Sequence, residues 1–390
     1  MPNRTFAADL AFLRAHRATL LLSAPDGDGR LAVVPEFQGR AMTSATHAAG
    51  RSLGFVKHEL VATRELQRGI NPYGGEDRLW IGPEGGPFSV FFAPGAEQTI
   101  EHWQTPAPID SEPWALVAQD ASSARCEHRA RLVNASGTAF DVRIVRTLEV
   151  LDARSALAEL GLAPGGLRCV AFESRNLLAN AGAAPWRKAT GLLSIWILGM
   201  FPPSARTTVV LPLAVGPERA LDGLVDDAYF GSVPPARLAR VPSAGGSALL
   251  FLADGRLRKK VGVAPAAARP LAGSWDAEHG CLTLVTFTLP SGAHEYVNSR
   301  WGRAQAEPYR GDVLHAYNDG PSAPGAEPFG PFYELESSSP AAALAPGESI
   351  AHHHRTLHLE GPRADLERAA RAVLGLPLAA IEASPGRSDR

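Results

Sequence analysis

The sequence predicts a mainly β protein built from antiparallel sheets. Short runs rich in Val, Leu, Phe and Thr recur along the chain and are separated by Gly, Pro, Asn and Asp. One such run, residues 140–151, alternates so that Val142, Ile144 and Arg146 face away from Arg143. Alternation with a period of two, interrupted by turn residues, is typical of antiparallel strands rather than of strand–helix–strand units.

Helical periodicity is confined to three segments. Apolar side chains recur three or four positions apart in residues 5–17 and again in residues 362–375, where the run begins at a proline and stops at Gly375. Residues 153–160 predict one further short helix. These patterns favour short amphipathic helices that cover the ends of a β structure.

The composition is that of a folded globular protein. Of the 390 residues, 45% are apolar and 20% are charged, and the net charge of -2 provides no electrostatic attraction for nucleic acid or an anionic membrane. No stretch approaches the ~20 apolar residues of a membrane span. We therefore expect neither partner. The N-terminal segment lacks the pattern of a signal peptide, so the sequence as it stands predicts a cytoplasmic protein, and a periplasmic or secreted one if a leader has been removed.

Cysteine usage indicates thiols rather than disulfides. Cys126, Cys169 and Cys281 are far apart, odd in number and without the CxxC spacing of a metal site. We expect all three to be buried structural thiols.

Three segments resemble the galactose-mutarotase-like (aldose 1-epimerase-like) superfamily. They are residues 71–86, NPYGGEDRLWIGPEGG; residues 180–196, which end in GLLSIW; and residues 332–349, which contain FYELESSSP and a Pro-Gly-Glu turn. The sequence is most similar to an uncharacterised bacterial family within this superfamily, with which it shares GGEDRLWIGPEGG, GLLSIWILGMF and YNDGP.

The resemblance implies an antiparallel β super-sandwich. We expect residues 1–20 to form an N-terminal helix and lead-in, residues 21–361 the super-sandwich, and residues 362–383 a C-terminal helix packed on the same domain. It also implies a sugar site on a concave sheet, with the base of an epimerase at Glu336 or at Glu334, two residues away.

One position departs from the superfamily pattern. Aldose epimerases carry a histidine, the general acid, just after the Gly-Leu that this sequence has at 191–192, whereas here the place is taken by Leu193 and Ser194. Neither side chain delivers a proton near neutral pH as an imidazole does. The general acid must therefore be sought elsewhere.

The loop GGEDRLWIGPEGG combines the residue types that bind sugars. Its glycine pairs allow close approach of the backbone, an arginine can donate to hydroxyls or a carboxylate, and an indole stacks on sugar C–H groups. The alternative is a tight turn whose acids pair with its own arginine. The predicted substrate-binding residues in this loop are Glu76, Asp77, Arg78, Trp80 and Glu84.

Glu334 and Glu336 form the predicted acid–base pair. On a strand, the two carboxylates face the same side. Like charges that are partly buried raise at least one pKa, which suits a general base or a metal ligand. The alternative is a solvated polar face.

Four histidines are further candidates. His58 and His315 are possible general acids, each weighed against a structural, hydrogen-bonded role. His352 and His354 share one face of the strand after the Pro-Gly-Glu turn, with His353 on the other, and are weak candidates for metal ligands beside an ordinary role as polar strand residues. We expect no cofactor, with a divalent metal left open.

Two polar clusters complete the set. Tyr317, Asn318 and Asp319 either contact sugar hydroxyls or form a turn. Lys188, with Trp186 and the basic run 255–262, GRLRKKVG, could contact an acidic sugar, although a solvated basic turn is the simpler account of that run. Trp196 is expected in the core.

These residues predict a carbohydrate-active protein whose partner is a mono- or oligosaccharide. The leading hypothesis is an aldose-epimerase-like isomerase that performs acid–base chemistry at or near the anomeric centre. A non-catalytic sugar-binding module and a metal-dependent lyase or glycoside hydrolase are the alternatives, because the fold alone does not define the reaction. The sequence leaves the oligomeric state open.

Overall fold

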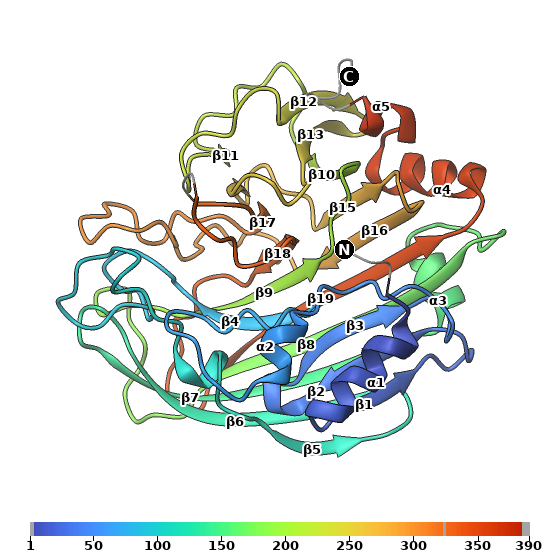
Figure 1. Cartoon of the computed structure of the whole chain (residues 1–390). Helices are drawn as coiled ribbons and strands as arrows, with labels where there is room; N and C mark the ends of the chain where they lie inside the picture. Colours follow the sequence, from blue (N-terminus) through green and yellow to red (C-terminus); the bar gives the residue numbers. More distant parts are fainter. Residues whose placement is uncertain (1–3, 323–324, 384–390) are drawn as a thin grey trace.

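The computed structural model describes residues 4–322 and 325–383, and consists of three antiparallel sheets with short helices at the periphery (Figure 1). In the described residues, every pair of neighbouring strands runs antiparallel. The predicted fold class is therefore confirmed. Residues 1–3 of the predicted lead-in lie outside the described residues.

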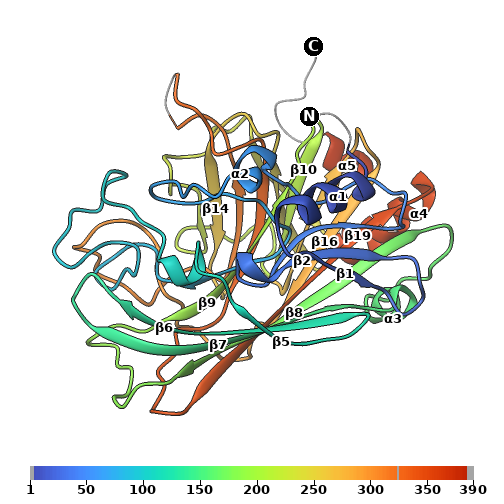
Figure 2. The same ribbon diagram turned by 60° about the horizontal axis from the view of Figure 1, so that its bottom comes forward.

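The largest sheet has ten strands and forms one layer of the molecule (Figure 2). In spatial order its strands are β12 (Leu238–Ser243), β13 (Gly246–Leu252), β10 (Thr207–Leu213), β15 (Leu271–Asp276), β16 (Cys281–Phe287), β19 (Ser349–Glu360), β8 (Arg168–Asn180), β7 (Ala139–Val150), β6 (Ser123–Val133) and β5 (Ala115–Gln119).

A second sheet of six strands lies against the large one. Its order is β11 (Val225–Asp226), β14 (Lys259–Val263), β17 (Leu314–Asn318), β18 (Tyr333–Ser338), β9 (Ser194–Phe201) and β4 (Arg78–Gly82). A small third sheet comprises β1 (Leu20–Ser23), β2 (Arg30–Val34) and β3 (Arg40–Ala45).

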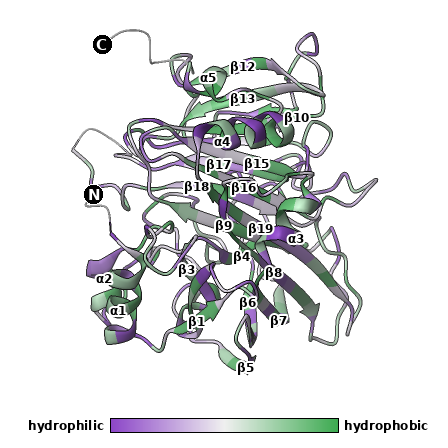
Figure 3. Ribbon diagram, turned by 90° about the vertical axis from the view of Figure 1, so that its right-hand side faces the viewer, coloured by the Kyte–Doolittle hydropathy of each residue, from purple (hydrophilic) through white to green (hydrophobic). Residues whose placement is uncertain are grey.

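The helices begin and end where local chemistry favours it. The side chain of Thr5 caps α1 (Phe6–His16) by accepting from the Ala8 amide, and Asp152 caps α3 (Ala153–Glu159). Both α1 and α4 carry hydrophobic and hydrophilic residues (Figure 3), as their amphipathic patterns predict. The remaining helices are α2 (His58–Ala62), α4 (Arg363–Ala369), which continues as a π-type turn to Leu374, and α5 (Leu378–Glu382).

Apolar side chains between the two large sheets form the main core. Tyr333 and Leu335 of β18 pack against strands of the ten-stranded sheet, among them β10 and β13. Because strand side chains alternate, their neighbours Glu334 and Glu336 project to the opposite face of the six-stranded sheet. All three cysteines are buried and free, as predicted.

Polar groups also cross the space between the sheets. Arg146, on β7, forms a buried ion pair with Asp77 and donates to the Asp77 carbonyl oxygen at 2.8 Å. Burial raises the pKa of the Asp77 carboxyl, and the charge of Arg146 opposes that shift. Nearby, the Glu76 carboxylate accepts from Ser44 and lies 2.8 Å from Nε2 of His358.

The Arg146–Asp77 pair supports a stability prediction. We expect Arg146→Met to lower the free energy of unfolding by about 3 kcal/mol, because it leaves a carboxylate buried without its cation. Equilibrium denaturation by urea measures the change. Arg131→Met, which breaks an exposed pair with Asp141, is the matched control and should change stability little. Equal effects of the two substitutions would contradict the prediction.

Candidate functional site

The outward face of the six-stranded sheet carries a row of charged and aromatic side chains. The strand register places Arg78 beside Leu198, Leu198 beside Glu336, and Glu336 beside His315, on four successive strands. Glu334 lies one step along β18 on the same face, next to Tyr317. The expectation that Glu334 and Glu336 share a face is therefore confirmed.

Glu334 forms an ion pair with Arg78 that joins two strands of this face. Its Oε1 accepts from Nη2 of Arg78 at 2.8 Å, and both side chains are almost fully buried. Burial raises the pKa of Glu334 to about 8; the charge of Arg78 opposes this shift and that of Glu336 adds to it. Glu334 is thus a carboxyl that can carry a proton at neutral pH.

Glu336 lies deeper and is held differently. Its Oε2 accepts from Nζ of Lys260 at 2.8 Å and from the indole Nε1 of Trp196 at 2.9 Å, and Nδ1 of His315 is 3.7 Å away. The side chain is completely buried. Glu336 and Glu334 therefore contact different partners: an ammonium and an indole N–H for Glu336, and a guanidinium for Glu334.

His315 connects this pair to a second acidic group. Burial, together with the charge of Lys260, lowers the pKa of His315 well below its usual value, so the imidazole is neutral. Its Nε2 is 3.5 Å from the hydroxyl of Tyr229, which donates to Asp312 at 3.0 Å. Burial and the charge of Asp226 raise the pKa of Asp312 to about 7.

A narrow pocket lies over this face, with a cavity volume of about 60 Å³ inside about 490 Å³ of empty space that includes open solvent. Glu334, Arg78 and Lys260 form part of its floor, and Glu84 enters from the loop after β4. Burial raises the pKa of Glu84, and Lys260 opposes that shift. The apolar and aromatic part of the lining includes Trp80, Trp103, Trp196, Leu198, Phe230, Phe329 and Phe332.

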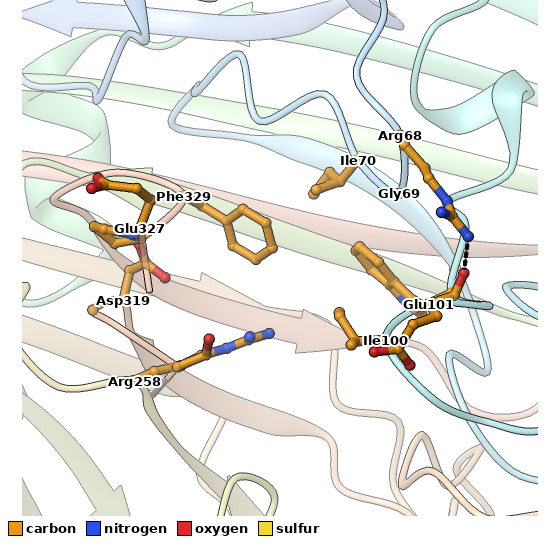
Figure 4. Close-up of a pocket in the computed structure, with 13 residues that line it drawn as sticks. Arg68, Gly69, Ile70, Ile100, Glu101, Arg258, Asp319, Glu327 and Phe329 are labelled. Carbon is orange, nitrogen blue, oxygen red and sulfur yellow. Dashed lines mark hydrogen bonds between the residues drawn. The ribbon is translucent and has the colours of Figure 1, made fainter. Parts of the chain in front are cut away.

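Two wider pockets share residues with this one. One has an empty volume of about 780 Å³ and is shown in Figure 4, where Arg258, Asp319 and Phe329 lie opposite Ile70 and Ile100. The other, of about 970 Å³, is lined by Tyr229, Lys260, Glu84 and Trp301 among others.

Long loops build the walls of these pockets. Residues 83–106 and 288–313 lie side by side on the left in Figures 1 and 2, joined by the Phe92–Trp301 ring contact and by the bond from Gly302 to Gln98. The floor thus comes from the sheet and the walls from the loops.

Two residues of the glycine-rich loop, Glu76 and Asp77, do not line the pocket. Glu76 and Asp77 are completely buried and point between the sheets, toward His358 and Arg146. The prediction that they bind substrate does not fit this placement. Arg78, Trp80 and Glu84, by contrast, do line the pocket.

The glycine pairs serve packing rather than ligand approach. Gly74 has a φ of 100°, and a Cβ there would lie 2.0 Å from the carbonyl oxygen of Phe55. A Cβ on Gly85 would lie 2.3 Å from the carbonyl oxygen of Arg300. Both positions therefore require glycine so that neighbouring loops can pass closely.

His58 and Lys188 lie away from the pocket. His58 contacts Asp9 at 2.8 Å and lines a separate hollow beside α1, so it cannot act with Glu336. Lys188 is exposed and paired with Glu295. The hypothesis of His58 as general acid, and of Lys188 as a substrate contact, is not supported by these positions.

The Tyr317–Asp319 segment supports the site. Tyr317 lines the pocket and donates to Asp319 at 2.6 Å, and Asp319 also accepts from the Gly330 amide. Asn318 turns the other way: it accepts from the Gly255 amide and donates to the Leu257 carbonyl oxygen. Asn318 thus fixes a loop instead of contacting a ligand.

His352 and His354 lie on the far side of the six-stranded sheet. Both imidazoles contact the hydroxyl of Ser337, at 2.7 and 2.8 Å. Across residues 4–322 and 325–383, no group of three or more His, Cys, Asp or Glu is arranged to hold a metal ion. The two histidines are buried structural residues, which corrects their candidacy as metal ligands.

Three residues have roles that the sequence did not indicate: Lys260 and Arg258 of the basic run, and Trp196. Lys260 is buried against Glu336, so the expectation of a solvated turn is wrong for it. Trp196 is buried as expected, but it also lines the pocket and donates to Glu336. Arg258 lines all three connected pockets. The only advance signal was the clustering of cations in GRLRKKVG.

Leu193 and Ser194, which stand where aldose epimerases carry the catalytic histidine, do not contribute to the pocket over the six-stranded sheet. The pocket-lining residues include neither Leu193 nor Ser194. Among the described residues, the Ser194 hydroxyl is buried without a hydrogen-bond partner.

Comparison with known proteins places the chain in a family. The model of the family of unknown function DUF6786 matches residues 4–384. The chain belongs to this family. No curated protein matches the chain.

Solved structures agree on the fold of this DUF6786 member. A proposed aldose 1-epimerase from Escherichia coli K12 superposes with a TM-score of 0.53 at 15% identity, covering 88% of this chain and 99% of that one. The Slr1438 protein from Synechocystis sp. PCC 6803 has a TM-score of 0.52 at 15% identity, with coverage of 88% and 96%. The fold is galactose-mutarotase-like, as the sequence resemblance implied.

No helix in the described part of this family member has the length and apolar character needed to cross a membrane.

The two buried histidines that contact Ser337 predict how stability depends on pH. Burial, with smaller contributions from neighbouring charges, lowers the pKa of His352 and of His354 to about 3. The unfolded chain, with histidine pKa values near 6.5, binds protons that the folded chain excludes, so stability falls as the pH falls from about 6.5 toward 3.

We expect a loss of about 2 kcal/mol for each of these imidazoles between pH 7 and pH 5. His354→Asn should show a smaller loss over this interval than the native chain, as urea denaturation at the two pH values would measure. His353→Asn, an exposed neighbour, is the control. A wild-type acid dependence in His354→Asn would sink this prediction.

Proposed function

We propose that the protein is a carbohydrate-active enzyme that exchanges protons with a sugar at or near its anomeric centre. The observation that carries the proposal is the pair of buried carboxyls on β18, of which Glu334 lines an aromatic pocket beside Arg78. The mutarotase-like fold supports a sugar as the ligand. Indole rings such as those of Trp80, Trp103 and Trp196 offer apolar faces to sugar C–H groups.

Glu334 is assigned the role of general acid. With a pKa of about 8, Glu334 has both forms accessible near neutral pH: the carboxylate pairs with Arg78, and the protonated carboxyl can deliver a proton to a ring oxygen. Arg78, bonded to the same carboxyl, positions it and stabilises the carboxylate that remains after the proton leaves. Glu334 therefore takes the part that the superfamily gives to the histidine absent from this chain.

Glu84 is assigned the role of base. Proton removal and return at a sugar need two groups that reach the ring from different directions. Glu84 enters the pocket from the loop after β4, whereas Glu334 rises from the sheet floor. Glu336 accepts from Lys260 and Trp196 and contributes to the raised pKa of Glu334.

Loss of the Glu334 carboxyl should slow turnover strongly. We expect Glu334→Gln to lower the rate of enzyme-catalysed anomer exchange by 10²–10⁴-fold, the usual contribution of a general acid. Exchange spectroscopy by NMR on a panel of free sugars measures this rate directly. Glu295→Gln, an exposed carboxylate paired with Lys188, is the control. Sugars that bind without any anomer exchange or new product would instead indicate a non-catalytic binding module.

The pH profile should report the protonated form of Glu334. We expect kcat/KM to fall as the pH rises through about 8, because the general acid is then lost. Initial rates between pH 6 and 9.5 measure the limb. A rise in kcat/KM through pH 8 would show that Glu334 acts as a base instead.

A further inference from the structure

Arg258 occupies the point where the three connected pockets meet. It directly precedes β14 and lines the inner pocket with Glu334, the outer pocket of Figure 4, and the side pocket with Tyr229. In Figure 4 its guanidinium extends across the pocket from the Asp319 side toward Ile100. Arg258 is therefore shared by the linings of all three pockets.

The guanidinium of Arg258 has no polar partner in the described part of the chain. It donates no hydrogen bond and forms no ion pair there, and its Nε is buried. It is held instead by two rings, with its Cζ 4.4 Å from the centroid of Phe230 and 5.3 Å from that of Phe329. Aromatic faces fix the plane of a guanidinium while leaving its N–H groups free to donate.

The other two cations of the pocket differ in this respect. Arg78 is paired with Glu334, and Lys260 with Glu336. Asp319, which lines the outer pocket with Arg258, accepts from Tyr317 and from the Gly330 amide.

The acids around this point interact with Arg258 only at longer range. Glu84 accepts from the side chain of Trp301; burial raises the pKa of Glu84, and the charges of Lys260 and Arg258 oppose that shift. Glu101 and Glu327 line the outer pocket, but neither forms an ion pair with Arg258 in the described residues. The N–H groups of Arg258 thus lack a direct acceptor at the pocket junction.

Several buried donors of the inner pocket lack a protein acceptor. They are Nε and Nη1 of Arg78 and the indole Nε1 atoms of Trp80 and Trp103, as far as the described residues show. All three side chains line the same pocket as Arg258. A ligand rich in acceptors would satisfy these donors.

The loop that carries Arg258 is held before any ligand binds. Asn318 clamps it by two hydrogen bonds, to the Gly255 amide and the Leu257 carbonyl oxygen. A Cβ on Gly320 would lie 2.5 Å from the Leu257 amide nitrogen, so the turn after β17 packs directly on this loop. A side chain fixed in this way loses little conformational entropy when it binds.

We propose that the substrate is an anionic sugar, bearing a carboxylate or a phosphate, and that Arg258 binds this group. The inference rests on the proposed function, since it names the substrate class of the same pocket. A planar guanidinium with free N–H groups matches the oxygens of a carboxylate or phosphate in a bidentate geometry. A neutral sugar offers the guanidinium of Arg258 no charged acceptor, which disfavours it relative to its anionic counterpart.

Calorimetric titration with matched sugars tests the substrate class. The panel comprises glucose, glucose 6-phosphate and glucuronate, with galactose and galacturonate as a second set. We expect at least one anionic sugar to bind roughly tenfold or more tightly than its neutral counterpart. Phosphate-only binding assigns the ligand as a sugar phosphate, and carboxylate-only binding assigns it as a uronate. Equal or tighter binding of the neutral sugars, or no binding of any anionic sugar, would overturn the proposal.

Substitution of Arg258 tests the residue. We expect Arg258→Gln to weaken the anionic sugar roughly 10–100-fold and any neutral sugar less than about threefold. Arg256→Gln, an exposed arginine two positions earlier, is the matched control. Arg258→Lys keeps the positive charge but loses the bidentate guanidinium. Its affinity for the anionic sugar should therefore lie between those of the native chain and of Arg258→Gln. An Arg258→Gln variant that binds the anionic sugar as tightly as the native chain would refute the role of Arg258.

The binding readout separates this inference from the proposed function. If Arg258 governs anionic-sugar affinity while Glu334→Gln leaves anomer exchange intact, the catalytic assignment fails and the substrate class stands. If Glu334→Gln stops exchange on neutral sugars and Arg258→Gln has no effect on binding, the reverse holds. Melting curves of each variant confirm that the fold is retained.

Discussion

The pairing of two buried carboxyls with two cations from neighbouring strands is the constraint on which the site depends. Glu334 and Glu336 point the same way because strand side chains alternate, and at this depth neither could remain without a partner. Arg78 reaches one from β4, and Lys260 reaches the other from β14. The two ion pairs therefore bind the floor of the pocket to strands on both sides of β18.

The same constraint separates the roles of the two acids. One carboxyl faces a guanidinium and the pocket, whereas the other faces an ammonium, an indole N–H and the sheet. Chemically identical side chains two residues apart thus acquire different surroundings, and burial beside Arg78 raises the pKa of Glu334. Only the packing of strands from distant parts of the sequence creates that difference.

The sequence could predict which side chains share a face of a strand, but not which neighbours cover them. Alternation predicted the shared face of Glu334 and Glu336, and it placed Arg146 on the same face as Val142 and Ile144. It also explains in retrospect why Asp77 turns away from the pocket: it precedes Arg78 and so faces the opposite side of the sheet. Residue patterns could not indicate that Glu334 rather than Glu336 lines the pocket, because that depends on which neighbours cover each carboxyl.

The basic run shows the same limit for cations. A segment such as GRLRKKVG has the same local pattern whether it lies in solvent or enters a pocket. Lys260 is buried because β14 pairs with β17, and Arg258 is fixed because Phe230 and Phe329, far away in sequence, stack on it. Likewise, the roles of His352 and His354 depended on Ser337, which faces them only across the two sheets.

The concentration of indoles in the pocket has a practical consequence. Trp80, Trp103 and Trp196 are three of the seven tryptophans, and their rings meet or closely approach one another. Their light emission is sensitive to the polarity and the charges around them, and a molecule entering the pocket would alter both at once. The intrinsic tryptophan fluorescence of the protein should therefore change when a ligand binds in the pocket where the chemistry is proposed to occur.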